Sequence, residues 1–533
     1  MKANFARIIG VVCVFAVALA FRLPDLGLRP MHHDEANQAV KCGDLQQTGV
    51  YKYDLGDHHG PSLYYLTLPV AWMASGKDFV GTSEFTFRIV PVMFGAAVIP
   101  LLLLLLGGLE WGVIICSAVF FAISPAMVFY SRFYIQEMLL VFFTLAAIAA
   151  GWRYFINRTA GWAVWTGFFL GMMFVTKETS VMAYVAMAGA LLIVYLWERR
   201  GDPVVGSAYE SVQEVPTRVF NLRHFLFVLG TAGLVWIIFF SSFFTNWSGP
   251  ADSILAYKSY LSKSTESVHV HPWYYYLQIL ACWRNAPGPT WSEGLILVLA
   301  LAGLIAVMTG KESAVGCDRR FMRFMAIYTV LLTVIYSAIP YKTPWCLLSF
   351  LSGMIILAGI GVVFLFSVLR GHLTRIILCF ILAGAVWNLA KQSRDTNFRF
   401  YTDPRNPYVY AHTSRDFLNL IKRVEMLARI DREGRNMFVA VVAPPREMWP
   451  LPWYLRSFGK VGFWTSAGEL TEGIHPAVVV VSSGEHDAVV SRLGASYHME
   501  YFGLRPDVLL TVLVRQDLWD SFIKQGGASG NIK

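Results

Sequence analysis

The sequence predicts a mainly α-helical membrane protein, in which a polytopic helical bundle of about eleven spans precedes a small C-terminal α/β domain. Of the 533 residues, 56% are hydrophobic and 15% are charged, whereas soluble domains carry about 25% charged residues. Long apolar runs fill most of residues 1–390, and residues 391–533 have shorter runs among Arg, Asp, Glu, Pro and Gly. These observations exclude a soluble enzyme and predict two domains, a transmembrane domain over 1–390 and a soluble domain over 391–533.

A window of about 19 residues identifies the apolar segments that are long enough to cross a bilayer. Eleven such segments lie near residues 6–21, 85–106, 109–130, 136–152, 161–176, 179–197, 224–244, 292–309, 324–340, 345–369 and 374–390. The first also has features of a signal peptide, because Lys2 and Arg7 precede an apolar run that ends in small residues. We favour an uncleaved anchor, since the further spans make a separate export signal unnecessary.

Basic residues in alternate loops predict the side of the membrane on which each loop lies. The loops assigned to the cytoplasm hold Arg153, Arg158, Arg199, Arg200, Arg218, Arg223, Lys311, Arg319, Arg320, Arg323, Arg370 and Arg375. Since cytoplasmic loops carry an excess of Lys and Arg, the N-terminus lies inside and the long loops 22–84 and 245–291 lie outside. An odd number of spans places the C-terminal domain outside as well. We therefore expect an integral protein of the cell (inner) membrane whose active site and C-terminal domain are extracytoplasmic.

Charge and cysteine usage exclude two other classes of protein. The net charge of +9 follows from the loop bias, and no basic block with interleaved aromatic residues indicates a nucleic-acid partner. The seven cysteines are scattered without a Cys-x-x-Cys pair, so neither a zinc ribbon nor a disulfide framework is predicted. The composition leaves membrane lipids as the first expected partner.

Three short outer connections each keep one cation at the end of a span, namely Arg132, Lys177 and Lys342. Any one of them alone could be a long side chain that reaches back to the membrane interface. Three on one face favour a phosphate at the level of the lipid headgroups, because its charge must be paired where water is partly excluded. Glu137 and Glu178 lie beside two of these cations and serve either as ion-pair partners or as metal ligands.

The first outer loop opens with a cluster of acids and imidazoles, Met31-His32-His33-Asp34-Glu35. It lacks the spacing of two histidines on one helical turn that a zinc protease requires. One interpretation is a solvated helix start with Asp34 as its cap. The other is a carboxylate that is held near the membrane surface as a general base.

Histidines farther along the outer loops leave several interpretations open. His58 and His59 precede the Gly60-Pro61 turn and face solvent, a sugar or a metal. His271 in the second long loop lies next to the aromatic run 273–276, which suits either an interfacial belt or a carbohydrate and metal site.

Several motifs occur together in residues 5–200, and their order carries a family resemblance. They are Asp34-Glu35, the stretch Asp57-x-x-Gly60-Pro61-Ser62-Leu63-Tyr64-Tyr65, Ser124-Pro125, Tyr130-Ser131-Arg132-Phe133 with Glu137, Gly167-Phe168-Phe169-Leu170-Gly171, and Thr176-Lys177-Glu178. This order resembles the dolichyl-phosphate-mannose-protein mannosyltransferase family and its bacterial relatives that glycosylate lipid A, all of the GT-C glycosyltransferase fold. The His-Asp-Glu opening, the turn 341–345 and the soluble tail look most like the flippase-activity-associated subfamily.

The resemblance implies a polyprenyl-phosphate-linked sugar donor, a glycan, protein or lipid acceptor outside the membrane, and a single inverting displacement at the anomeric carbon. By position, Asp34 would be the general base on the acceptor hydroxyl, with Glu35 its neighbour in the motif. Arg132, Lys177 and Lys342 would stabilise the departing lipid phosphate.

The resemblance also implies further binding residues. Many relatives have Pro-Pro-Leu where this chain has Gly60-Pro61-Ser62-Leu63, and His58 and His59 stand where some relatives have a cation just before that turn. His58, His59 and Glu137 are the further candidates for binding the donor. Metal dependence varies in the superfamily, and Glu35, His58 and His271 are the candidate ligands for a divalent metal.

A rival function of another class would use the same cations. A transporter or flippase accessory would bind the lipid-linked sugar without breaking the glycosyl bond and would need no base. The absence of a visible internal repeat argues against a transporter. A structural membrane protein with an interaction domain would explain the hydropathy but not the charges.

The tail has the pattern of a small α/β domain. Residues 413–428 predict an amphipathic helix, and residues 437–443, 477–482 and 508–514 predict short buried strands. No Gly-x-Gly-x-x-Gly follows the first strand, which disfavours dinucleotide binding. The Pro- and Trp-rich segment 443–454 instead either caps the membrane domain or forms an aromatic platform for an acceptor glycan, and we favour the cap.

Overall fold

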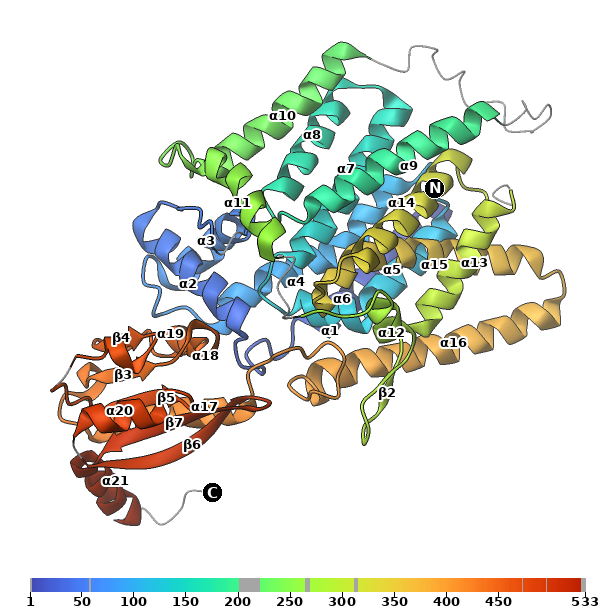
Figure 1. Cartoon of the computed structure of the whole chain (residues 1–533). Helices are drawn as coiled ribbons and strands as arrows, with labels where there is room; N and C mark the ends of the chain where they lie inside the picture. Colours follow the sequence, from blue (N-terminus) through green and yellow to red (C-terminus); the bar gives the residue numbers. More distant parts are fainter. Residues whose placement is uncertain are drawn as a thin grey trace.

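A computed structural model describes residues 2–56, 59–200, 221–263, 269–310, 315–471, 473–494 and 496–528. It shows a bundle of long helices with a small sheet domain at one end (Figure 1), which confirms the predicted fold class. The bundle helices are α1 (Lys2–Arg22), α4 (Glu84–Leu101), α5 (Trp111–Ile123), α6 (Pro125–Ser131), α7 (Glu137–Asn157), α8 (Ala160–Phe174), α9 (Ser180–Arg200), α10 (Leu222–Phe240), α13 (Gly294–Met308), α14 (Arg319–Ala338), α15 (Leu348–Val368) and α16 (His372–Arg394).

Every predicted span coincides with one of these helices, except that 109–130 coincides with the pair α5 and α6. Within the described ranges, eight helices are long and apolar enough to cross a membrane, or nine if the bent pair α5–α6 forms one span. The shorter apolar helices α8 and α13 have 15 residues each and account for the other two predicted segments. His58, Arg218 and Lys311, which the sequence analysis singled out, lie outside the described residues.

The bend between α5 and α6 brings the chain around Ser131 and Arg132 toward the first outer loop. The two helices meet at 59°, and Pro125 occupies the first turn of α6, where its missing N–H breaks the ladder of the preceding helix. The Ser124 hydroxyl caps α6 by accepting a hydrogen bond from the N–H of Met127 at 3.3 Å.

Glycines allow the bundle helices to approach backbone to backbone. A Cβ added at Gly303 of α13 would lie 2.1 Å from the Leu357 carbonyl oxygen of α15, and one added at Gly361 would lie 1.9 Å from the Leu299 oxygen. Such contacts between small residues are common in membrane helices, because close approach of the backbones supplies the van der Waals packing that holds helices together in lipid.

We call one end of the bundle the loop face, defined by residues 23–83 and 241–293. It carries α2 (His33–Thr48), α3 (Ser62–Ser75), α11 (Gly249–Lys263), α12 (Tyr275–Ala281) and the short strands β1 (Trp283–Arg284) and β2 (Thr290–Trp291). Near the other end, Glu198 accepts a hydrogen bond from Arg323 at 2.5 Å and lies within 4 Å of Arg319 and Arg320. These arginines belong to the loops predicted to be cytoplasmic.

The C-terminal domain lies against the loop face (Figure 1). It comprises α17 (Arg415–Ile430), β3 (Val439–Val442), α18 (Pro445–Met448), α19 (Leu451–Tyr454), β4 (Val461–Trp464), β5 (Val478–Ser482), α20 (His486–Leu493), β6 (Tyr497–Arg505), β7 (Val508–Arg515) and α21 (Gln516–Ala528). The strand order is β4-β3-β5-β7-β6, in which β3 is parallel to β4 and β5, and β7 is antiparallel to β5 and β6. The three predicted strands correspond to β3, β5 and β7.

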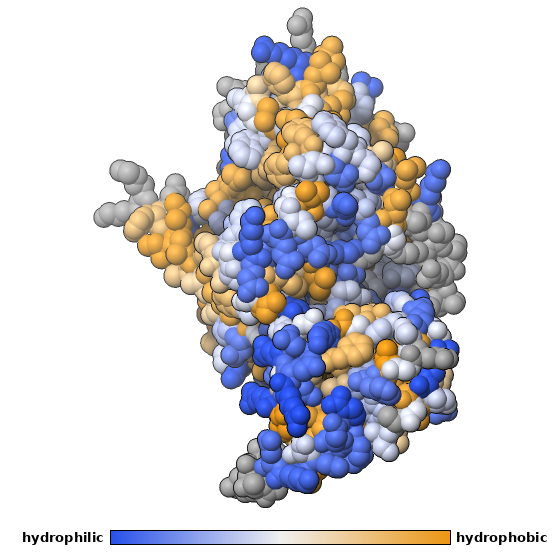
Figure 2. All heavy atoms as spheres, turned by 90° about the vertical axis from the view of Figure 1, so that its left-hand side faces the viewer, coloured by the Kyte–Doolittle hydropathy of each residue, from blue (hydrophilic) through white to orange (hydrophobic). Residues whose placement is uncertain are grey.

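The Pro- and Trp-rich segment of the tail caps the membrane domain. Trp453 of α19 is fully buried and packs edge-on against Phe79 and Phe87, at ring distances of 5.6 and 5.3 Å. Arg456 covers its other face at 3.5 Å and donates a hydrogen bond to the Thr82 carbonyl oxygen at 2.6 Å. Figure 2 shows hydrophobic and hydrophilic residues intermixed on this face, with hydrophilic residues across its middle and over much of its lower part, where the C-terminal domain lies.

Candidate active site

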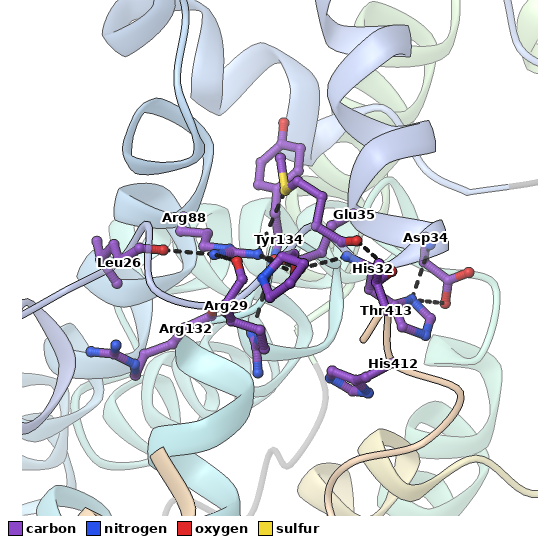
Figure 3. A network of polar contacts seen from close by, with 12 residues as sticks. Leu26, Arg29, His32, Asp34, Glu35, Arg88, Arg132, Tyr134, His412 and Thr413 are labelled. Atoms are coloured by element: carbon purple, nitrogen blue, oxygen red, sulfur yellow. Dashed lines mark hydrogen bonds and ion pairs between the residues drawn. The ribbon is translucent and has the colours of Figure 1, made fainter. Parts of the chain in front are cut away.

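The start of α2 places the two neighbouring carboxylates of the predicted motif in different surroundings. His32 is the N-cap residue, and Glu35 lies at the third helical position. The Glu35 carboxylate accepts a hydrogen bond from the His32 backbone N–H at 3.1 Å, while the His32 ring accepts one from the N–H of Asp34. This reciprocal capping turns Glu35 into the protein and Asp34 away from it (Figure 3).

Glu35 is fully buried and fully paired. Arg88 of α4 donates to both carboxylate oxygens, each at 2.7 Å, and the N–H of Tyr134 donates at 2.9 Å. Burial opposes ionisation of Glu35, but the charges of Arg88 and Arg29 outweigh that effect and hold its pKa below the ordinary value. Glu35 is therefore a charged structural anchor that joins α2 to α4.

Asp34 has a free carboxylate. About a third of its side chain is exposed, 34%, and its oxygens accept no hydrogen bond within the part of the chain that the structure describes. The nearest cationic candidate is His32, whose Nδ1 lies 3.8 Å from Asp34 Oδ2. That nitrogen already accepts a hydrogen bond from the Asp34 N–H at 3.0 Å, so it carries no proton to share. Asp34 can therefore accept a proton from a bound molecule.

The His32 ring is fixed from both sides. Because Nδ1 is an acceptor, Nε2 carries the proton and donates to the Tyr410 carbonyl oxygen at 3.1 Å. Burial lowers the pKa of His32, which agrees with a neutral ring. Trp345 lies edge-on at 6.0 Å, so the turn that holds Asp34 is next to the turn that holds Lys342.

Lys177 forms a buried ion pair with Glu137 at the loop face. The pair joins the end of α8 to the start of α7. Lys177 also lies close enough to Cys346 to act on it electrostatically. Since Cys346 follows Trp345 directly, the Lys177–Glu137 pair and the 342–346 turn form one neighbourhood.

Lys342 is buried, and its ammonium donates to the carbonyl oxygens of Ile339 and of His271, the latter at 3.2 Å. Burial lowers its pKa from the ordinary value. No carboxylate among the described residues forms an ion pair with it, so its charge is balanced by carbonyl dipoles alone.

Arg132 makes its hydrogen bonds at the end of α1. Its guanidinium donates to the carbonyl oxygens of Arg22, Pro24 and Asp25 at 2.8, 2.6 and 3.1 Å, and it stacks over Phe398 at 4.6 Å. It therefore neutralises the carbonyl end of α1, where a helix carries partial negative charge. Figure 3 shows Arg132 and Asp34 on opposite sides of the Arg88–Glu35 pair.

His59 lies beside Glu178, with its Nδ1 at 3.7 Å from the carboxylate. The following residue is glycine because the chain touches the end of α8: a Cβ at Gly60 would lie 2.2 Å from the Val175 carbonyl oxygen. The Tyr53 hydroxyl donates to the same Glu178 at 3.2 Å. His59 and Glu178, which the sequence indicated separately, thus meet across the loop face.

Glu35 and His271, the two candidate metal ligands among the described residues, do not fit a metal site. Both oxygens of Glu35 are taken by Arg88, Tyr134 and His32, and His271 stacks on Tyr275 at 4.0 Å beside the cationic Lys342. Within the described ranges, no group of three His, Cys, Asp or Glu side chains could hold a metal ion.

Three residues of this region, Arg88, Tyr410 and His412, were not predicted from the sequence. Arg88 lies inside a predicted span, and an ionisable residue in an apolar span is a signal of a buried partner. Tyr410 and His412 lie between α16 and α17, and their rings pack on those of Trp345 and Phe133. No pattern in the sequence marks these two.

Comparisons with known proteins agree with this architecture. Residues 63–245 match the model of the dolichyl-phosphate-mannose-protein mannosyltransferase family. ArnT from Cupriavidus metallidurans is 14% identical over 96% of this chain and 98% of its own, with a TM-score of 0.60, and its complex with undecaprenyl phosphate gives 0.59. The Archaeoglobus fulgidus oligosaccharyltransferase tethered with an acceptor peptide is 10% identical over 94% of this chain and 74% of its own, with a TM-score of 0.54. No curated protein matches the chain.

These matches show the fold of this protein, which is that of ArnT and of the archaeal oligosaccharyltransferase, and its long apolar helices indicate an integral membrane protein. The matches confirm the resemblance to the dolichyl-phosphate-mannose-protein mannosyltransferase family, and glycosyltransferase is the predicted class of enzyme. The closer resemblance to the flippase-activity-associated subfamily stays a prediction.

Proposed function

We propose that the protein transfers a sugar from a polyprenyl-phosphate donor to an extracytoplasmic acceptor, with Asp34 as the general base. One observation carries this proposal: of two adjacent carboxylates, Glu35 is buried and fully paired, whereas Asp34 is half-buried and free to accept a proton. Neighbouring carboxylates with such different surroundings are typical of a division between structural and chemical roles.

The reaction is a single inverting displacement. The acceptor oxygen bonds to the anomeric carbon while the bond from that carbon to the phosphate oxygen breaks, and the electron pair leaves with polyprenyl phosphate. The acceptor proton passes to Asp34. Negative charge grows on the leaving phosphate, and Lys177 and Lys342 supply the positive charge that stabilises it.

The partners of two proteins with the same fold support these substrate classes. ArnT was captured with undecaprenyl phosphate, and the archaeal oligosaccharyltransferase was tethered with an acceptor peptide. A polyprenyl phosphate is therefore the donor carrier we propose, and the acceptor is a glycan, a protein or a lipid.

Release of free carrier lipid tests the reaction. The full chain in nanodiscs is incubated with undecaprenyl-phosphate-linked hexoses, mannose among them, and with a panel of glycan, peptide and lipid acceptors. Wild type should release undecaprenyl phosphate only when an acceptor is present, and Asp34→Asn should be at least about 100-fold slower, since a general base contributes about 10²- to 10⁴-fold. Asp54→Asn, which removes a carboxylate that is 53% exposed in the same loop, is the matched control and should be fully active.

Two outcomes would contradict the proposal. Full activity of a correctly inserted Asp34→Asn protein would remove the base assignment. Tight donor binding without release for every acceptor would favour a flippase accessory, which needs no base.

A further inference from the structure

Both backbone polar groups of Met31 are held by the tail. Met31 precedes the N-cap of α2 and its side chain is fully buried. Its N–H donates to the Tyr454 hydroxyl at 2.9 Å, and its carbonyl oxygen accepts a hydrogen bond from the Thr413 hydroxyl at 2.7 Å. Buried backbone groups must be paired, and here the pairing comes from residues about 400 positions away in the sequence.

A second connection runs through the His32 ring. The N–H of Asp34 donates to His32 Nδ1 at 3.0 Å, and His32 Nε2–H donates to the Tyr410 carbonyl oxygen at 3.1 Å. The backbone of the proposed base is thus tied to the tail through one rigid imidazole. Figure 3 shows Thr413 close to His32 and the Asp34 side chain beyond it.

The tail can hold this turn because it is itself anchored on the membrane domain. Trp453, next to Tyr454, is fully buried against Phe79 and Phe87, and Tyr454 packs on Phe417 of α17 at 5.4 Å. The hydroxyl of Tyr454 is therefore fixed relative to α4, the helix that also pairs with Glu35.

We infer that the C-terminal domain is a positioning element of the active site, which acts on Asp34 through Tyr454, Thr413 and Tyr410. This inference rests on the proposed function, because the tail can position the general base only if Asp34 is that base. Glu35 and Arg88 fix the inner side of the turn, and the tail fixes its outer side. Neither Tyr454 nor Thr413 touches the substrate in this scheme.

Removal of single hydroxyl groups tests the inference. In the nanodisc assay, with the donor and acceptor that wild type turns over, Tyr454→Phe and Thr413→Val should each lower kcat about 10- to 100-fold, as misplacement of a reacting group by about 1 Å does. The KM for the donor should be unchanged, because the hydroxyls of Tyr454 and Thr413 bond to Met31 and not to Lys177 or Lys342. Thr413→Ser keeps the hydroxyl and should restore activity, and Tyr501→Phe, at a tyrosine that is 63% exposed, should be neutral.

A double variant separates positioning from a general structural effect. If Tyr454 acts through Asp34, Tyr454→Phe should add no further loss in an Asp34→Asn background, because effects of residues that act as a unit are not additive. A multiplied loss, a raised KM with unchanged kcat, or full activity of both Tyr454→Phe and Thr413→Val would overturn the inference. If Tyr454→Phe fails to insert, the Thr413→Val and Thr413→Ser pair decides alone.

The same measurements distinguish a failure of the proposed function from a failure of the positioning role. Full activity of Asp34→Asn, or no turnover with any donor and acceptor, would refute the proposed base and with it any positioning of that base. An inactive Asp34→Asn together with fully active tail variants would refute only the positioning role.

Discussion

Arg88 determines the roles of the two neighbouring carboxylates, because it pairs with Glu35 and not with Asp34. The side chains of Arg88 and Glu35 are at most 1% exposed, and removal of one partner from a buried ion pair costs about 3–5 kcal/mol, because the other charge is left without compensation. Glu35→Gln should therefore lower the free energy of unfolding by about 3 kcal/mol or more, measured by denaturation in detergent. Glu433→Gln, which removes an exposed partner of Lys460, should change it by less than about 1 kcal/mol. Equal stability of the two variants would contradict this role of Glu35.

The Lys177–Glu137 pair allows a charge swap that separates stability from chemistry. Each single replacement should destabilise the protein, since the pair is buried. The double variant Lys177→Glu with Glu137→Lys should regain most of that stability. It should not regain transfer activity if Lys177 stabilises the leaving phosphate, because the cation would then be on α7 and no longer in the connection between α8 and α9. Recovery of both properties would show that the pair is only structural.

The sequence identified the charged residues of the loop face but not their partners. Asp34 and Glu35 look equivalent in the sequence, and only the position of Arg88 makes one structural and leaves the other free. Arg132 was grouped with the two lysines because all three follow spans, and its hydrogen-bond partners, the carbonyl oxygens of Arg22, Pro24 and Asp25, were not predicted. Backbone carbonyls are present in every segment, so no residue pattern indicates which of them will meet a side chain.

At the scale of elements, two histidines form a pH-sensitive junction between the tail and α2. The rings of His32 and His412 lie 4.9 Å apart, and burial lowers the pKa of both below the ordinary value of 6.5. Arg29 and Arg88 lower that of His412 further, whereas Asp34 and Glu35 oppose the shift of His32. Both rings are therefore neutral in the docked state.

Docking of the tail should weaken in acid. The undocked histidines bind protons more readily than the docked ones, so the stabilisation is present above about pH 6.5 and is lost as the pH falls below it. Amide hydrogen exchange of residues 408–416 should show protection that falls by up to about tenfold per histidine and pH unit. His412→Phe should reduce this pH dependence, and His475→Gln, at an exposed histidine, should not. A protection factor that is constant from pH 7.5 to 5.5 would contradict the junction.

Elements were predicted well where one physical signal dominates. A run of about 20 apolar residues has few alternatives to a membrane helix, and all eleven predicted segments are helices. β3, β5 and β7 were predicted because they are apolar and mostly buried. β4 and β6 were missed because they lie at the edges of the sheet, where exposed and half-buried residues interrupt the pattern.

At the scale of the whole molecule, the loop face and the Arg-rich cluster lie at opposite ends of the helical bundle. α1 starts at the end opposite the loop face and Arg22 reaches that face, where the C-terminal domain also lies. The Arg-rich cluster around Glu198 occupies the other end. If basic loops stay in the cytoplasm, the loop face and the tail must both be extracytoplasmic.

Cysteine accessibility in intact cells tests this orientation. With the native cysteines replaced, Glu433→Cys in the tail should react with a membrane-impermeant maleimide, because its side chain is 56% exposed. Arg319→Cys, whose side chain is 49% exposed near the other end, should react only after the membrane is permeabilised. The reverse labelling pattern would show that the protein has the opposite orientation, with Asp34 in the cytoplasm. Labelling of both positions from outside would place the tail and the Arg-rich end on the same side of the membrane. That result would contradict the odd number of spans that we predict between them.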